Sequence, residues 1–186
     1  MKMGKTIIIN LEKVNISGDV LDVGEKNLGI IYNLTKEAQE EMSLDYVNSE
    51  SKIQLKNREY DACTFFFELN KVWTSIEKEK IIKEVYKYIK LGGEILIWDI
   101  NKERGKVFNN KIKVILPKSN IKEFNFKNLN VITSSNIEET KKILEKYFNI
   151  EETKAWEDIF FLRGKKLETN VKEEEKNENE GVTYSD

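Results

Sequence analysis

The residues most suited to chemistry in this chain are an aspartate and a glycine that close a short apolar run. Residues 20–23 read Val-Leu-Asp-Val, Gly24 follows, and apolar residues then recur at helical spacing from Ile30. In an open α/β sheet, a strand-to-helix turn of this kind presents a carboxylate and free backbone N–H groups to a ligand at the carboxyl edge. Asp22 and Gly24 are therefore the first candidates for a binding site.

Two further acids follow predicted strands. Glu68 comes directly after the apolar run of residues 60–67, and Asp45 lies in residues 42–47, a second predicted strand that ends near it. Because the carboxyl ends of parallel strands meet at one edge of a sheet, Asp22, Asp45 and Glu68 are expected on the same side of the protein. Each acid also has a simpler interpretation, since an acid often marks the end of a strand that binds nothing.

The absence of histidine restricts the chemistry further. The 186 residues include no histidine and one cysteine. Ser-His-Asp catalysis, Cys-His catalysis and a histidine general base are thereby excluded, and no metal site formed by the protein is expected. Any reaction has to use carboxylates, lysines, tyrosines or the positioning of the reactants.

Length, composition and charge predict one globular domain in the cytoplasm. No apolar run is long enough for a membrane span or a signal peptide, and the single Cys63 fits a reducing compartment. Residues 165–186 hold four lysines and seven acids, so the net charge of −2 leaves about +1 on residues 1–164. That is no basic excess for a nucleic-acid partner. We predict a folded domain over residues 1–164 and a disordered acidic tail over 165–186.

Hydrophobic patterning predicts alternating strands and helices. Residues 19–23, 60–67 and 94–100 are predicted buried strands, and the first 16 residues form a lead-in with a short apolar anchor or strand. The capping box of Thr74 and Glu77 predicts the start of a helix that ends at Gly92-Gly93, and Ser135 and Glu138 predict the start of another.

Two hairpins are also predicted: an inserted β-hairpin over residues 105–133 that turns at Pro117, and a closing antiparallel hairpin over 150–156 and 158–164. The large aromatic residues predicted to pack in the core are Phe65, Phe66, Phe67, Trp73 and Trp98.

Four segments together resemble the motifs of one known family. Residues 20–24 resemble its first motif, and residues 59–70 resemble its fourth strand, which commonly opens with an aromatic–Asp pair. Residues 91–99, Leu-Gly-Gly-Glu-Ile-Leu-Ile-Trp-Asp, are similar to the entry to its fifth strand. Residues 144–166 resemble its last helix and terminal hairpin. The family is the class I S-adenosylmethionine-dependent methyltransferases, and the resemblance covers roughly residues 17–166.

The resemblance implies a Rossmann-like α/β fold with an open, mostly parallel sheet flanked by helices. It also implies S-adenosylmethionine as cofactor and a small molecule as methyl acceptor. Glu68 and Asn70 would face the transferred methyl group, and Glu68 is the candidate catalytic residue, a carboxylate able to deprotonate the acceptor. The residues that the resemblance assigns to the cofactor are Asp22, Gly24, Glu25 and Gly29 in the first motif, Asp45 and Tyr46 at the second strand, and Phe67 and Glu68 at the fourth.

Two departures from the family pattern keep a second hypothesis open. Lys26 and Leu28 stand where the family has glycines, and glycine is used where backbone approaches a ligand closely. Residues 46–60 are too few for the helix and third strand that the family places there. The alternatives are therefore an active methyltransferase and a non-catalytic protein of the same fold that serves as a binding or assembly module, with a small-molecule substrate or a protein partner. A nicotinamide-dependent enzyme fits the loop less well. In either case residues 105–133 are expected to form a lid or a homodimer surface.

Overall fold

The computed structural model describes residues 4–24, 28–35, 59–167 and the backbone of residues 44–47. Its main sheet has the strand order β3-β2-β4-β5-β9-β8. The first four strands of that order are parallel, whereas β9 runs antiparallel to both of its neighbours. This arrangement confirms the predicted α/β fold with a Rossmann-like, mostly parallel sheet. The strands are β2 (Val20–Val23), β3 (Leu44–Val47), β4 (Tyr60–Phe66), β5 (Ile89–Ile100), β8 (Phe148–Trp156) and β9 (Ile159–Lys166).

A second, three-stranded sheet packs against the first. Its strands are β1 (Thr6–Asn10), β6 (Phe108–Leu116) and β7 (Asn120–Asn128), in the order β1-β6-β7. β6 and β7 form an antiparallel hairpin around the short turn η2 (Pro117–Ser119). β1 pairs parallel with β6, and Ile7 lies opposite Ile112. The apolar start of the chain is therefore a strand, and its partner is a segment far along the sequence that local patterning does not identify.

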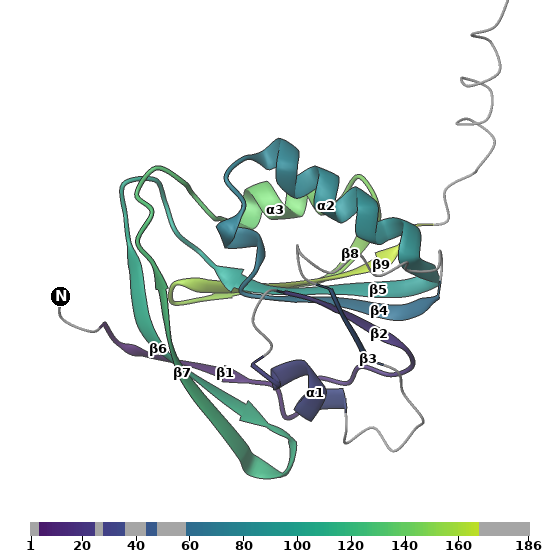
Figure 1. Cartoon of the computed structure of the whole chain (residues 1–186), viewed down its shortest axis with the longest axis horizontal. Coiled ribbons are helices and arrows are strands. Elements are labelled where there is room, and N and C mark those ends of the chain that lie inside the picture. The colour runs from purple at the N-terminus through teal and green to yellow at the C-terminus, as the bar shows by residue number, and fades with distance from the viewer. Residues whose placement is uncertain (1–3, 25–27, 36–43, 48–58, 168–186) are drawn as a thin grey trace, which may run out of the picture.

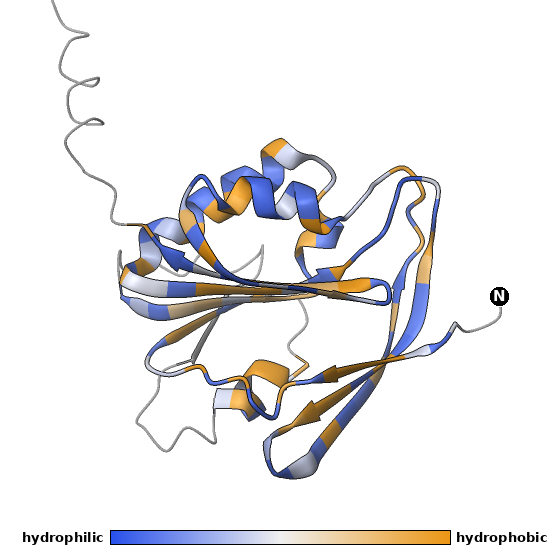
Figure 2. Cartoon of the chain, turned by 180° about the vertical axis from the view of Figure 1, so that it is seen from behind, coloured by the Kyte–Doolittle hydropathy of each residue, from blue (hydrophilic) through white to orange (hydrophobic). Residues whose placement is uncertain are grey.

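The elements are arranged in layers around the main sheet (Figure 1). Helices α2 (Ser75–Tyr88) and α3 (Ile137–Leu144) cover one face, while the short helix α1 (Ile30–Thr35) and the second sheet cover the other. Each face has its own core of buried apolar side chains. Hydrophobic residues accordingly run along β1 and α1 (Figure 2). Within residues 4–24, 28–35 and 59–167, no helix is long and apolar enough to cross a membrane.

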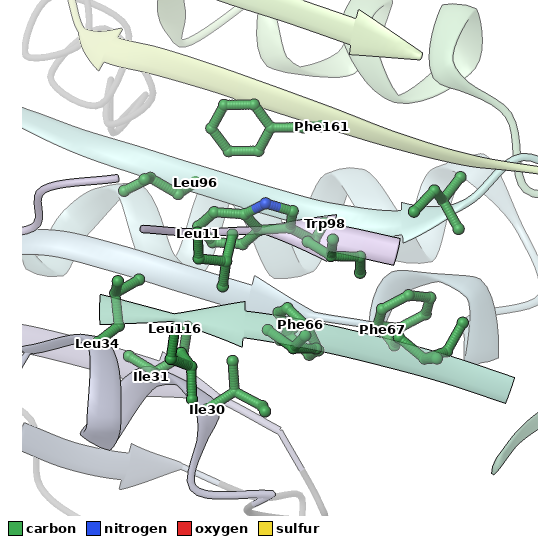
Figure 3. Packing of buried hydrophobic residues seen from close by; sticks show 14 of the residues in the cluster. Leu11, Ile30, Ile31, Leu34, Phe66, Phe67, Leu96, Trp98, Leu116 and Phe161 are labelled. Atoms are coloured by element: carbon green, nitrogen blue, oxygen red, sulfur yellow. The ribbon is translucent and has the colours of Figure 1, made fainter. Parts of the chain in front are cut away.

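Aromatic side chains fill the space between the two sheets near the carboxyl end of β4. Trp98 of β5 stacks on Phe161 of β9 with ring centroids 4.7 Å apart, and the ring of Phe66 lies 5.9 Å from Trp98 (Figure 3). Phe67 packs against Phe126 of β7 at 4.8 Å. Such aromatic pairs add about 0.5–1.5 kcal/mol beyond their burial. The cluster therefore fastens the inserted hairpin to the main sheet.

The start of α2 is as predicted, whereas its end is not. The Thr74 hydroxyl accepts a hydrogen bond from the backbone N–H of Glu77 and caps the helix. The helix ends at Tyr88, and the glycine pair predicted to end it lies inside β5. Gly93 serves a close approach between strands instead, because a Cβ on this residue would lie 2.8 Å from the carbonyl oxygen of Asp61.

Two smaller predictions also need correction. α3 is capped by Asn136, whose side chain accepts a backbone N–H of the first turn, and not by Ser135. Trp73 is 67% exposed rather than packed in the core. In addition, β9 continues through Lys166, past the predicted domain boundary at residue 164. Most of the predicted acidic tail, residues 168–186, lies outside the described residues.

Lys166 takes the place of the predicted glycine cap at the end of α2. The residue is only 5% exposed. Its Nζ donates to the carbonyl oxygens of Tyr86 and Ile89, at 2.5 and 2.6 Å. The last carbonyl groups of a helix have no N–H partner within the helix, so an ammonium group satisfies them well. The last strand of the chain thus fixes the end of α2.

Replacing this lysine should therefore destabilise the fold. Lys166→Met removes the donor from two carbonyl groups at the helix end, and the free energy of unfolding should fall by about 1–3 kcal/mol. Urea unfolding followed by circular dichroism measures the change. Lys165→Met is the matched control, because this neighbouring lysine is exposed, and it should change stability by less than about 0.5 kcal/mol. Equal effects of the two substitutions would contradict the capping role.

Candidate functional site

The predicted ligand corner lies where β2 ends beside β4. Asp22 is paired in register with Thr64 of β4, and the Thr64 hydroxyl donates a 2.6 Å hydrogen bond to the Asp22 carboxylate. Burial raises the pKa of Asp22 to about 6, the hydrogen bond from Thr64 opposes this, and the negative charge of Glu68 adds to it. The carboxyl group is thus held by the sheet and gains a proton more easily than an exposed aspartate.

Glu68, at the exit of β4, lies directly over Gly24. A Cβ on Gly24 would lie 3.1 Å from both Cγ and Oε1 of Glu68, which is tighter than most side-chain contacts. Glu68 also forms an ion pair with Lys71 at 2.6 Å, in which the Lys71 side chain is 35% exposed. Glycine at position 24 therefore allows the exit of β4 to approach the end of β2, and the Glu68 side chain occupies the space that the glycine leaves.

A small cavity remains at this corner. It encloses about 20 Å³ and is open to solvent on one side. That volume holds about one water molecule, whereas pockets for small-molecule ligands measure roughly 300–1,000 Å³. Residues 25–27 of the adjoining loop lie outside the described residues. Among the described ones, the lining side chains and glycine are Asp22, Val23, Gly24, Leu28, Ile30, Ile31, Phe66 and Glu68.

The remaining predicted cofactor residues are Phe67, Asp45, Tyr46, Glu25 and Gly29. Phe67 is buried in the aromatic cluster with a left-handed φ of 60°, and its neighbour Phe66 lines the cavity instead. Asp45 and Tyr46 lie within β3, where their backbones pair with Leu21 and Asp22. Glu25 and Lys26 lie outside the described residues, and Gly29, with φ of 63°, directly precedes α1. The structure therefore brings Asp22, Gly24 and Glu68 together. It adds Thr64, whose signal in the sequence is a hydroxyl inside an apolar strand.

Asn70 holds the backbone at the exit of β4 rather than facing the corner. It lies in the short helical turn η1 (Leu69–Lys71) and is 2% exposed. Its backbone N–H and side-chain amide donate to the buried carboxylate of Asp99, at 2.8 and 2.7 Å. Asn128 of β7 donates in turn to the side-chain oxygen of Asn70 at 2.9 Å. This network fixes the segment that carries Glu68, so Asn70 is a positioning residue.

Two larger cavities in the described part of the chain have charged linings. One of about 650 Å³ lies beyond the end of β5; within its lining Glu103 pairs with Lys106 at 3.0 Å, whereas Glu157 and Asp158 pair with Lys5, which is outside the lining. The other, of about 310 Å³, lies near the amino end of β4 and includes the Lys90–Asp61 pair at 2.8 Å. Neither touches the corner formed by Asp22 and Gly24, so the corner remains the candidate site.

Comparison with known proteins defines the fold. No protein-family profile and no curated protein matches the sequence. Among solved structures, an S-adenosylmethionine-dependent methyltransferase from Mesorhizobium loti matches with a TM-score of 0.53 at 10% identity, over 80% of this chain and 90% of that one. A SAM-dependent methyltransferase from Methanosarcina mazei gives 0.50 at 16% identity, over 80% and 92%. A protein from Pyrococcus horikoshii gives 0.51 at 13% identity, over 84% and 85%. This chain therefore has the class I methyltransferase fold.

The buried Asp99 should make stability depend on pH. Burial raises its pKa to about 7, although three hydrogen bonds to the carboxylate and the charge of Lys78 oppose the shift. The folded state then holds the proton more tightly than the unfolded state, in which the pKa is 3.8. The stabilising contribution of this bound proton to the free energy of unfolding is complete below about pH 4, and it is lost as the pH rises to about 7. The wild type should therefore lose on the order of 3 kcal/mol relative to Asp99→Asn across that interval.

Urea unfolding at several pH values measures this difference. Asn70→Ala is the matched control, because it breaks the same network without removing the carboxyl group. It should lower stability at every pH and keep a pH slope of the wild-type sign. Parallel pH profiles for the wild type and Asp99→Asn would show that the carboxyl group titrates as it does in water.

Proposed function

We propose that this chain is an S-adenosylmethionine-dependent methyltransferase that acts on a small molecule. The observation that carries the proposal is the meeting of Asp22, Gly24 and Glu68 at one corner of the sheet. The corner lies between β2 and β4, where the strand order reverses direction, and open α/β sheets bind ligands at this point. The fold supplies the second support, since proteins of known structure with the same fold are methyltransferases.

The Glu68 side chain has to turn away before S-adenosylmethionine can enter the corner. Its ion pair joins a Lys71 side chain that is 35% exposed to a Glu68 side chain that is 13% exposed, so the turn breaks a partly buried contact. The displaced side chain leaves the backbone of Gly24 accessible, and Gly24 has no Cβ to obstruct a ligand. The cofactor, when bound, would supply an electrophilic methyl group. Glu68 would then lie at the mouth of the site, where its carboxylate can accept a proton from the methyl acceptor.

A non-catalytic protein of the same fold is the second candidate function. It is favoured by the corner of only about 20 Å³ and by Leu28, which lines it where the family has glycine. Such a protein would bind a protein partner, and the exposed side chains of Trp73 and Ile76, at 67% and 69%, are suited to that role. Under either function we place the protein in the cytoplasm, because its single cysteine is buried and free.

Calorimetric titration with S-adenosylmethionine and S-adenosylhomocysteine tests the proposal. The wild type should bind both, and Gly24→Val should weaken binding by tenfold or more, because the new side chain takes up the space needed by the ligand. Asp158→Asn, which changes a half-exposed acid distant from the corner, should bind as the wild type does. Circular dichroism establishes that each variant folds. No binding by the wild type at millimolar ligand would reject the methyltransferase and favour the second candidate.

Glu68→Ala should strengthen cofactor binding if the side chain obstructs the site. The ligand would no longer have to break the ion pair with Lys71, so the dissociation constant of S-adenosylhomocysteine should fall by up to about fivefold. Glu84→Ala is the matched control, because it breaks an exposed i,i+3 pair with Lys87 elsewhere. An unchanged or weaker affinity of Glu68→Ala would mean that Glu68 does not compete with the ligand.

A further inference from the structure

The strand β7 is an open edge of the second sheet. It pairs with β6 on one side, and among the described residues no strand lies on its other side. The backbone N–H of Lys111 in β6 donates to Lys5, next to β1, so the following residue, Ile112, directs its backbone groups to β7. Ile112 lies opposite Phe124, whose N–H and C=O are thereby used. The backbone groups of Asn125, the next residue, therefore point outwards from the sheet.

The outward backbone groups of β7 are available to another strand. Over the residues that the structure describes, the backbone of β7 bonds to β6 and to no other segment. The strand is nine residues long, and a large apolar side chain is exposed at each end of it, Ile121 at 48% and Leu129, just past its last residue, at 52%. An open edge of this length can pair with a strand of another chain.

The exposed side chains of β7 complement themselves when two copies run antiparallel about Asn125. In that arrangement Glu123 of one copy lies opposite Lys127 of the other, and by symmetry two such pairs of opposite charges form. Lys127 has no ion pair within the described residues, so its charge is available. Ile121 of each copy lies opposite Leu129 of the other, which covers the exposed apolar side chains. Opposite charges and apolar pairs directly across two strands both stabilise the pairing.

The inner side of β7 also matches itself in this register. Phe124 lies opposite Phe126 of the second copy, and Lys122 lies opposite the amide of Asn128. Both rings are only half-buried against the core of one chain, so each can gain contact from a second ring. These residues would form the non-hydrogen-bonded pairs of the new ladder, in which facing side chains approach most closely. Aromatic pairs in such positions are favourable.

Other symmetric registers of the same two strands are less favourable. Centring the pair on Glu123 or on Lys127 places two like charges opposite each other, which is destabilising. Centring it on Phe124 or on Phe126 gives every charge of the strand an uncharged partner. The register about Asn125 is the one among these that joins opposite charges, so the sequence of β7 favours a single arrangement.

We propose that two copies of this chain associate through β7, antiparallel and centred on Asn125. The second sheets of the two chains then form one continuous sheet, and the inserted hairpin is the interface that holds the dimer. The inference goes beyond the proposed function and needs no cofactor, since the contacts that carry it lie on the open edge of the second sheet.

Exchange of charges at Glu123 and Lys127 tests the register. Sedimentation velocity of the full chain over a range of concentrations measures the dissociation constant of the dimer, and circular dichroism establishes that each variant folds. Glu123→Lys and Lys127→Glu each place like charges opposite one another, so each should weaken the dimer by about tenfold or more. The double variant should return to within about threefold of the wild type. An equimolar mixture of the two single variants should form a heterodimer, because each supplies the charge that the other lacks.

A substitution at Asn125 tests the backbone pairing without changing charge. Its N–H points away from β6, so Asn125→Pro removes a hydrogen bond from the dimer and none from the hairpin. This variant should fold and sediment as a monomer, whereas Asn125→Ala, which keeps the N–H, should remain a dimer. Glu145→Lys is the control for charge reversal, because Glu145 is exposed and pairs with Lys141 in another part of the chain. It should leave the dissociation constant unchanged.

The outcomes decide the inference independently of cofactor binding. A wild type that stays monomeric at near-millimolar concentration overturns it. A wild-type dimer that Asn125→Pro leaves intact also overturns it, because the chains would then associate through another surface. A double charge variant that associates no better than the single ones contradicts the register about Asn125. None of these results bears on whether S-adenosylmethionine binds, so the proposed function stands or fails separately.

Discussion

A buried carboxyl group determines where the exit of β4 lies. Asp99 accepts both the backbone N–H and the side-chain amide of Asn70, and Asn70 accepts a hydrogen bond from Asn128. The end of β5, the turn η1 and the end of β7 are joined by these bonds. A buried polar group without a partner is costly, so none of the three segments moves without leaving the others unsatisfied. The position of Glu68 over Gly24 follows from this constraint.

The second sheet changes what the candidate site can contact. It covers a face of the main sheet that helices would cover in the expected architecture, and its aromatic residues interlock with the main sheet beside the candidate site. A strand presents every second residue to the same side. β7 therefore holds Lys122, Phe124, Phe126 and Asn128 half-buried on one side, and the ring of Phe124 lies 6.4 Å from Phe66 at the candidate site.

Local sequence signals identified much of the fold. The capping box at Thr74, the apolar central strands and the closing hairpin all depend on residues a few positions apart, and the structure contains them. The missed features depend on partners that are distant in sequence. Lys166 caps a helix 80 residues earlier, and Thr64 binds a carboxylate 42 residues away. Spacing within a segment does not report such contacts, so the glycine pair near residue 92 was assigned the wrong role.

Part of the candidate site could also be predicted from the sequence. Asp22, Gly24 and Glu68 were identified as strand-end residues, because a strand end in a parallel sheet defines the edge where ligands bind. That the Glu68 side chain occupies the corner could not be predicted from the sequence. It arises from the 3.1 Å approach of Glu68 to Gly24, which depends on how η1 is held by β5 and β7. The role of Asn70 was missed for the same reason.

The pairing of β1 with β6 has a consequence for biosynthesis. Thr6 is joined in register to Lys111, so the ribosome must translate about a hundred more codons before the first strand meets its neighbour. During that interval Ile7 and Ile9, which are fully buried in the finished protein, are exposed on the nascent polypeptide. A strand with unsatisfied edges and bare apolar side chains is prone to non-native association. β1 is thus open to non-native association until β6 has been synthesised.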